Sequence, residues 1–310
     1  MPIVRDLTGY GRNRPDIIWP NGARVAISLS LNFEEGAELS AEQGDGVTEA
    51  FGEVPSVQPP GVRDLVLEQT FDYGMRVGLW RFLDAFDRAG FKAALQICGL
   101  AAERVPELAR EAVAAGHEPI AHGWRWLAHS HYRDRETERT DIVRTIAAIE
   151  AATGVVPEGF FCRGSQSPWT RELLEELGFR YDSNALNDDL PYWHEGRQRP
   201  LLILPYSFDT NDMRYWYPNG FIVPSDFSRY CLTAVETLIR EADRGTSSML
   251  TIGFHTRISG RPARFAAVEE ILSRLSAWQD ERRVWIAPRG VIATHFADCF
   301  PSGARLVHAS

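Results

Sequence analysis

Several polar segments of this 310-residue chain directly follow apolar stretches that have the length of β-strands. The first, LNFEEG, carries Asn32, Glu34 and Glu35. Charged side chains are rarely buried unless they are paired or used, so two carboxylates at the end of an apolar stretch indicate a site. They could act as a general base, orient a water molecule or bind a cation. A solvated loop is the alternative.

Histidine, arginine and tryptophan follow three later apolar stretches: His122 with Trp124 and Trp126, Arg163, and His255 with Arg257. An imidazole at a strand end can protonate a leaving nitrogen or polarise a carbonyl, and His255 is the strongest catalytic candidate. Arg163 could pair with a first-strand carboxylate or bind an anionic or carbonyl-rich substrate. Arg257 could orient carbonyls or a carboxylate of the substrate. Buried structural histidines and surface arginines are the alternatives.

A further polar and aromatic region runs from YDSNALNDDLPYW to PYSFDTNDMRYW. From it we select Trp193 and Asp209 as substrate-binding candidates, together with Asn32, His122, Trp124, Trp126, Arg163 and Arg257. The tryptophans could form walls for a flat ring. Turn residues and helix caps are the alternative role for any one aspartate.

Strands and helices alternate from residue 24 to residue 290. We expect strands at 23–33, 91–99, 117–123, 156–162, 179–184, 201–207, 248–255 and 282–288, and helices at 74–90, 105–116, 136–154, 167–178, 226–245 and 264–278. This alternation predicts parallel strands with helical crossovers, and about seven such units favour a (β/α) barrel over an open sheet, in a single domain over residues 1–310. Barrel enzymes carry their chemistry at the carboxyl ends of strands, where the polar segments fall.

The net charge of −9 argues against nucleic acid or an anionic membrane as the main partner. No stretch has the length and apolar character of a signal peptide or a membrane span, and the four cysteines are widely spaced, so we expect a cytoplasmic protein with reduced thiols. No GxSxG, P-loop or GxGxxG motif follows a strand, which leaves serine nucleophile chemistry and nucleotide binding unsupported.

The order of these segments resembles the polysaccharide deacetylase superfamily, through NFEEG, HGWRW, RGSQSPWT and GFH. The resemblance implies a distorted (β/α) barrel with about seven strands, acidic residues after the first strand and a catalytic histidine after a late one. RDLTGYGRNRPDIIWP, DYGMRVGLWR and ISGRPAR are similar to the allantoinase-like branch, which also contains hydrolases of cyclic imides.

Metal-dependent deacetylases hold a divalent ion with one aspartate and both histidines of an HxxxH motif. Here Glu34 aligns with the ligand aspartate and Trp126 with the second histidine, so the ligand pair is incomplete. We therefore predict no firm cofactor. If a metal such as Zn²⁺ is present, Glu34, Glu35 and His122 are its candidate ligands.

We expect a hydrolase that opens the C–N bond of a cyclic amide, ureide or imide, with Glu34, Glu35 and His255 as catalytic residues. The adjacent Glu35 is slightly preferred as base. A metal-dependent deacetylase of N-acetylated sugars or peptidoglycan, or a catalytically inactive binding protein, are the alternatives. The resemblance implies a dimer or tetramer, with the excursion at residues 51–74 contributing to subunit contact or to the site.

Overall fold

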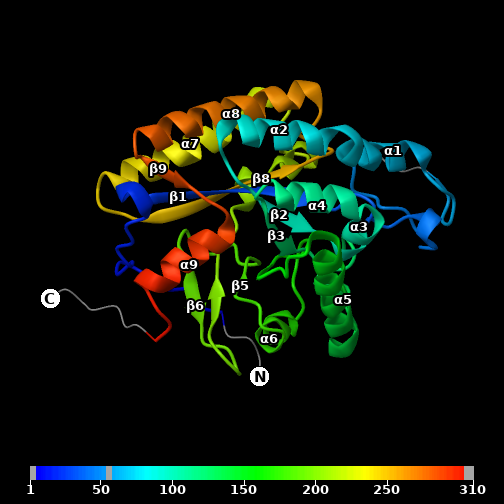
Figure 1. The fold of residues 1–310 in the computed structure, drawn as a ribbon, viewed down its shortest axis with the longest axis horizontal. Coiled ribbons are helices and arrows are strands. Elements are labelled where there is room, and N and C mark those ends of the chain that lie inside the picture. Colours follow the sequence, from blue (N-terminus) through cyan, green and yellow to red (C-terminus); the bar gives the residue numbers. More distant parts are fainter. Residues whose placement is uncertain (1–4, 54–57, 304–310) are drawn as a thin grey trace.

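The structure is a computed structural model that describes residues 5–53 and 58–303; residues 54–57 of the predicted excursion lie outside them. In this part of the chain the strands are β1 (Val25–Phe33), β2 (Ala94–Ile97), β3 (Glu118–Ala121), β4 (Gly159–Phe160), β5 (Tyr181–Asp182), β6 (Tyr192–His194), β7 (Leu201–Ile203), β8 (Ser248–His255) and β9 (Val284–Ile286). They form one sheet in the order β6-β7-β5-β4-β3-β2-β1-β8, and β9 pairs with the start of β1 (Figure 1).

The α/β fold with parallel strands is confirmed, and the sheet curls into a half-barrel. All strand pairs of the described chain are parallel except β6 with β7. The sheet stays open between its two edge strands, β6 and β8, where β6 pairs antiparallel with β7 on the side that β5 leaves free. Side chains and loops fill that gap: the backbone N–H of Thr251 donates to Ser207 Oγ at 3.1 Å, and that of His255 donates to Asp212 Oδ2 at 2.9 Å.

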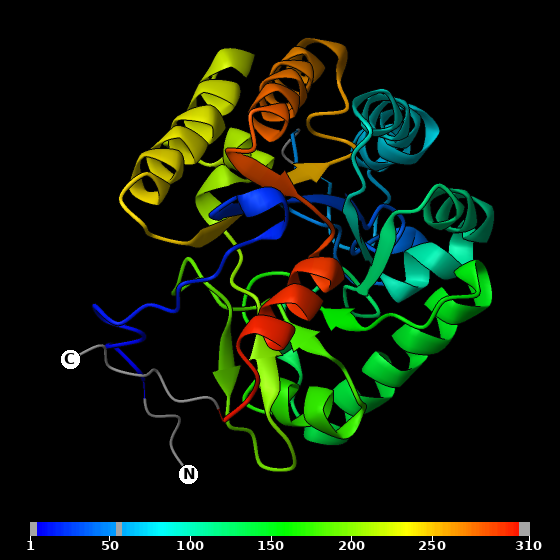
Figure 2. The same cartoon turned by 60° about the vertical axis from the view of Figure 1, so that its left-hand side comes forward.

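Helices surround the outer face of the sheet (Figure 2). Within the described residues they are α1 (Leu65–Tyr73), α2 (Leu79–Ala89), α3 (Gly99–Arg104), α4 (Pro106–Ala114), α5 (Arg135–Thr153), α6 (Thr170–Glu176), α7 (Pro224–Ala242), α8 (Pro262–Asp280) and α9 (Arg289–Cys299). The predicted helices are all present, and α1, α3 and α9 are additions, with α1 lying inside the predicted excursion. No helix in the described chain combines the length and apolar character that a bilayer span requires.

A π-helical turn, Gly74–Gly78, joins α1 to α2 and brings them close to the loop after β8. A Cβ atom on Gly74 would lie 2.6 Å from Thr256 Oγ1, and one on Gly78 would lie 2.0 Å from the Thr256 carbonyl oxygen. Only glycine allows this approach of helix to loop. The contact matters for function because Thr256 directly follows His255.

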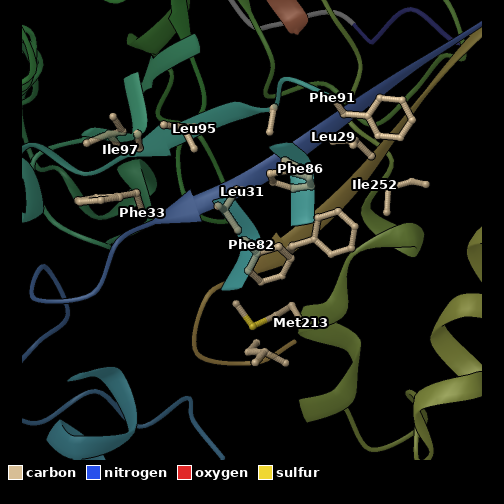
Figure 3. Close-up of a cluster of buried hydrophobic side chains, with 14 of the residues drawn as sticks. Leu29, Leu31, Phe33, Phe82, Phe86, Phe91, Leu95, Ile97, Met213 and Ile252 are labelled. Carbon is tan, nitrogen blue, oxygen red and sulfur yellow. The ribbon is translucent and has the colours of Figure 1, made fainter. Parts of the chain in front are cut away.

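Strand β1 divides the interior into two parts by alternation of its side chains. Its odd-numbered residues from Val25 to Phe33 belong to the apolar core beneath the outer helices, where Phe82 and Phe86 of α2 meet them (Figure 3). Its even-numbered residues point into the half-barrel and are small or polar: Ala26, Ser28, Ser30 and Asn32. The polar row leads toward the carboxyl end of β1, where the predicted site lies.

Helix α9 packs across the half-barrel at the end where the strands begin. The backbone N–H of Gly290 donates to the Glu118 carboxylate at the start of β3. Arg289, which is fully buried, donates to Thr251 Oγ1 at 2.5 Å and to the Leu204 carbonyl oxygen at 2.6 Å. The guanidinium therefore bridges the gap between β8 and the end of β7, and the opposite end of the barrel remains free for a site.

Candidate active site

A cavity of about 290 Å³ lies at the carboxyl ends of β1, β3 and β8. It is lined by Asn32, Glu34, Phe51, His122, Trp126, Phe161, Arg163, Gly164, Phe208, Asn211, Met213, Tyr217 and His255. A larger groove of about 1250 Å³ lies beside α7, but no histidine is among its lining residues. The chemistry therefore points to the smaller cavity, where a carboxylate and two imidazoles meet.

Glu34 is the central charged group of this cavity and is fully buried. Its Oε1 lies 2.6 Å from Arg257 Nη1 and 3.4 Å from His255 Nε2, and its Oε2 lies 3.3 Å from His122 Nε2. Burial by itself raises the pKa of Glu34, but the charges of Arg257 and the two histidines outweigh it and hold the pKa well below its usual range. Glu34 is therefore ionised at neutral pH.

Each histidine is held by a partner on Nδ1, which directs Nε2 toward Glu34. His122 Nδ1 lies 2.7 Å from the Phe161 carbonyl oxygen, and because a carbonyl only accepts, Nδ1 carries the proton. His255 Nδ1 lies 2.6 Å from Asp212 Oδ1. Asp212 is fully buried and also accepts from the backbone N–H groups of His255 and Ser259. An imidazolium at His255 would have a carboxylate on each side.

Asp212 is the functional residue that our selection from the sequence missed. Asp209, the residue selected from the same segment, lies in the groove beside α7, where its Oδ2 accepts from Tyr230 at 3.2 Å. The difference arises because the chain turns between the two: Asp209 lies in one short 3-10 turn and Asp212 begins the next. The spacing of Asp209 and Asp212 in a loop does not show which of the two aspartates lies beside the strand ends that form the cavity.

Glu35 points away from the cavity, as expected from alternation. Its Oε1 accepts from Thr256 Oγ1, and Oε1 lies 3.3 Å from Arg257 Nη1. A Cβ on Gly74 would lie only 2.5 Å from the same oxygen. Glu35 is thus enclosed between the π-helical turn and the loop after β8, so the slight preference for Glu35 as base does not fit its position.

Arg163 lines the cavity rim, but its guanidinium is already paired. Nη1 donates to Glu49 Oε2 at 2.6 Å and Nη2 donates to Glu49 Oε1 at 3.1 Å. Its guanidinium carbon also lies 3.7 Å from the centre of the Trp126 ring. The predicted pairing with a first-strand carboxylate is wrong, because Glu49 of the following excursion reaches Arg163 first.

Residues 39–53, which we call the strap, lie beside the cavity and are tied down by ion pairs. Each acidic residue of the strap pairs with an arginine from a different part of the fold: Glu42 with Arg104, Asp45 with Arg125, Glu49 with Arg163 and Glu53 with Arg264. Phe51 of the strap lines the cavity, with its ring 5.5 Å from those of Trp216 and Tyr217. The strap therefore forms one wall of the site.

The remaining predicted residues divide between the cavity and its surroundings. Asn32 lines the cavity and donates from Nδ2 to the Phe254 carbonyl oxygen at 2.9 Å. Trp124 is not among the lining residues and packs on Arg144, whose guanidinium carbon lies 3.5 Å from the ring centre. Trp193 is also remote, since its indole N–H donates to the Phe300 carbonyl oxygen near α9. Phe161, Asn211 and Tyr217 take the lining places instead.

The residues around Glu34 do not fit a divalent metal ion held by protein ligands. Trp126 offers no ligand where HxxxH would place its second histidine, and Arg257 already contacts one Glu34 oxygen. Glu35, the third candidate ligand, faces away. Within residues 5–53 and 58–303, no group of three or more His, Cys, Asp or Glu side chains is arranged to hold a metal ion. The chemistry of the site must be derived from side chains.

Comparisons with known proteins agree with this architecture. Residues 61–181 match the family model described as polysaccharide deacetylase. A Schizosaccharomyces pombe protein assigned to the polysaccharide deacetylases is 33% identical, with 94% of this chain and 96% of the relative covered. Two crystal structures are similar over 96% of this chain. One, from Pseudomonas aeruginosa PAO1 and also assigned to the polysaccharide deacetylases, has 40% identity, a TM-score of 0.88 and 99% of its own chain covered. The other, PuuE allantoinase, has 38% identity, a TM-score of 0.89 and 98% of its chain covered.

Proposed function

Because this chain belongs to the polysaccharide deacetylase family of hydrolases, we propose that it hydrolyses a C–N bond, and that its substrate is a small cyclic amide, ureide or imide. The observation that carries the proposal is the cavity itself. Its volume of about 290 Å³ is at the small end for ligand sites, and it holds one carboxylate flanked by two imidazoles. The likeness to PuuE allantoinase supports the same substrate class.

The shape and lining of the cavity favour a flat ring over a polymer. Aromatic side chains from separate elements face the space, among them Phe51, Trp126, Phe161 and Tyr217. Flat rings pack well against such walls, and a few polar groups then fix the orientation. Asn32 and His122 supply polar atoms at the base of the cavity. A bulky sugar chain would have to displace the strap.

In the first step, Glu34 acts as the general base. The carboxylate takes one proton from a water molecule while the water oxygen forms a bond to a ring carbonyl carbon, and the π-electron pair of the carbonyl moves onto its oxygen. The Nε2 side of His122 and the Asn32 amide are placed to orient the water and the ring. Glu34 is selected over Glu35 because only Glu34 lines the cavity.

In the second step, His255 delivers a proton to the leaving nitrogen. The electron pair on the former carbonyl oxygen re-forms the C=O bond, the ring C–N bond breaks with its electron pair passing to nitrogen, and nitrogen takes a proton from Nε2 of the His255 imidazolium. The proton that Glu34 took from water then passes to Nε2, which lies 3.4 Å from Glu34 Oε1, and both groups are restored. Asp212 holds the ring through Nδ1 and stabilises the imidazolium before transfer. The products are a carboxylic acid and an amide or ureide nitrogen on one opened chain. Loss of metal activation is tolerable, since the nitrogen of an imide or ureide is a stabilised leaving group.

The test is turnover of a panel of rings by purified protein treated with a chelator. Allantoin, hydantoin, dihydrouracil and succinimide cover the ureide, cyclic amide and imide classes, and ring opening is followed by loss of ultraviolet absorbance and by mass. We expect at least one substrate, with activity abolished in Glu34→Gln and retained in Glu38→Gln, a neighbouring buried glutamate outside the cavity. No turnover on the panel, with acetate release from N-acetylated sugar or peptidoglycan fragments, would favour the deacetylase alternative.

A further inference from the structure

Arg257 is held in a buried cage of aromatic rings. The side chain has no solvent-exposed surface, and its guanidinium carbon lies 4.4 Å from the ring centre of Phe71, 4.6 Å from that of Trp126 and 5.2 Å from that of Trp216. Nη1 contacts Glu34 and Glu35, whereas Nε and Nη2 have no hydrogen-bond partner. A buried guanidinium with so few polar partners is held in place by the ring faces and by the two carboxylates.

Trp126 stands where a metal ligand would be, and it also packs against Arg257. It occupies the HxxxH position where a histidine would ligate an ion, and it is 1% exposed. One face of its ring lies against Arg163 at 3.7 Å and the ring also contacts Arg257 at 4.6 Å. The same substitution therefore removes a ligand and supplies one wall of a guanidinium site.

The position of Arg257 puts one fixed positive charge against the catalytic carboxylate. Its Nη1 lies 2.6 Å from Glu34 Oε1, on the side of the carboxylate that also faces His255. A divalent ion bound to the same carboxylate would lie close to the guanidinium, and two like charges at such a separation repel strongly inside a protein. The guanidinium therefore disfavours a metal ion beside Glu34, whose other oxygen, Oε2, faces His122 Nε2 at 3.3 Å.

We propose that Arg257 is a positioning residue that gives Glu34 the fixed positive charge which a divalent ion gives the corresponding carboxylate in metal-dependent deacetylases, and that Trp126 holds Arg257 there. The catalytic part of this inference rests on the proposed role of Glu34 as base. The part that concerns metal exclusion does not, because it can be measured without turnover. Arg257 does not line the cavity, so it acts through Glu34 and not on the substrate.

The main experiment measures binding of Co²⁺ to the full chain by its visible d–d absorption. We expect no stoichiometric binding of Co²⁺ by the natural chain or by Trp126→His, because in both proteins the positive charge of Arg257 still lies against the Glu34 carboxylate. The double variant Trp126→His/Arg257→Met gains the second histidine ligand and loses the positive charge beside Glu34, and we expect it to bind one equivalent of Co²⁺. Binding by Trp126→His alone that is lost on Glu34→Gln would overturn the proposal, as would a double variant that folds and binds nothing.

A second experiment tests the catalytic part on whichever ring the panel identifies. We expect Arg257→Met to lower kcat by roughly 10²-fold and to leave KM within about threefold, since the charge acts on the base and not on the bound ring. Arg257→Lys should recover part of the loss. The matched control is Arg261→Met, in the same loop, whose guanidinium carbon lies 3.7 Å from the Tyr73 ring centre and has no ion pair with Glu34.

Each outcome of the second experiment decides one part of the proposal. If Arg257→Met fails to fold, judged by circular dichroism, Arg257→Gln carries the measurement, and a kcat unchanged from the natural chain in that folded neutral variant would overturn the positioning role. Equal loss in Arg257→Lys and Arg257→Met with raised KM would also overturn it. Absence of ring opening would defeat the proposed function, and the Co²⁺ result would still decide the metal-exclusion part.

Discussion

The floor of the cavity, by which we mean Glu34 with the side chains packed behind it, and the strap beside the cavity both depend on carboxylate–arginine pairs, but in opposite surroundings. Glu34 at the floor and Arg257, which lies behind it and outside the cavity lining, are fully buried. In the strap, Glu49 is 5% exposed and Arg163 27%, and the Glu42–Arg104 pair is about two-fifths exposed on both sides. Buried pairs interact strongly and leave an uncompensated charge when one partner is lost, whereas exposed pairs are screened by water and salt.

This contrast indicates that the two regions have different roles. The floor is formed by residues at the ends of strands, and its charges set the ionisation state of the catalytic groups. The strap is a loop that shapes access, and several weak ion pairs hold it without making any single one indispensable. Substitutions on the floor should therefore affect kcat and stability, and substitutions in the strap should affect KM and depend on salt.

The strongest test of the contrast is Glu34→Gln. We expect kcat to fall by about 10³-fold or more because the base is lost, and stability to fall by about 3–5 kcal/mol because Arg257 loses its main counter-charge. Chemical denaturation and ring-opening assays measure the two effects. An activity above one-tenth of the natural value in a folded variant would contradict the assignment of the base.

The second prediction concerns the support of His255. Asp212→Asn removes the negative charge beside Nδ1, and we expect kcat to fall by about 10²–10³-fold with little change in KM. The matched control is Asp209→Asn, three residues earlier, which should stay within about twofold because Asp209 lies in the outer groove. Equal falls in kcat for Asp212→Asn and Asp209→Asn would contradict the assignment of Asp212 alone as the support of His255.

The third prediction concerns Glu38, at the junction of floor and strap. Burial raises its pKa to about 7, and the hydrogen bond from the Gly36 N–H opposes this only in part. Because the folded state then binds more protons than the unfolded state, stability should fall as pH rises from the ordinary glutamate range to about 7 and level off above it.

Glu38→Gln should remove this pH dependence and stabilise the protein at pH 8 by up to about 3 kcal/mol, with little effect on activity. Thermal unfolding of both proteins at pH 5 and at pH 8 measures the difference. A parallel pH dependence in the natural chain and the variant would assign the effect to another group.

The smallest expected effect belongs to the strap. Glu49→Gln weakens one bidentate pair with Arg163, and we expect KM to rise about two- to fivefold with kcat nearly constant. Salt at about 0.5 M should raise KM more in the natural chain and in Glu49→Gln than in Glu42→Gln, because Glu42→Gln already lacks the exposed pair that salt screens. A fall in kcat comparable to that of Asp212→Asn would abolish the distinction between floor and strap.

The sequence by itself determined the order of strands and helices and six of the residues that line the cavity, Glu34, His122 and His255 among them. Hydrophobic periodicity locates the strands, and parallel strands bring their carboxyl ends to one edge, so Glu34, His122 and His255 could be expected to lie together. Alternation along β1 also separates Glu34 from Glu35 by face. These inferences need only local patterns and one rule of sheet geometry.

The tertiary structure decided which partner each charged group has. Arg163 meets Glu49 and Arg257 meets Glu34 across separations of more than 100 residues, and Asp212 takes the place beside His255 that Asp209 does not reach. Such pairings depend on loop paths and close glycine contacts, which have no periodic signal. The open seam between the edge strands β6 and β8 was likewise beyond the sequence pattern, because a crossover pattern fixes strand direction but not whether the last strand closes on the others.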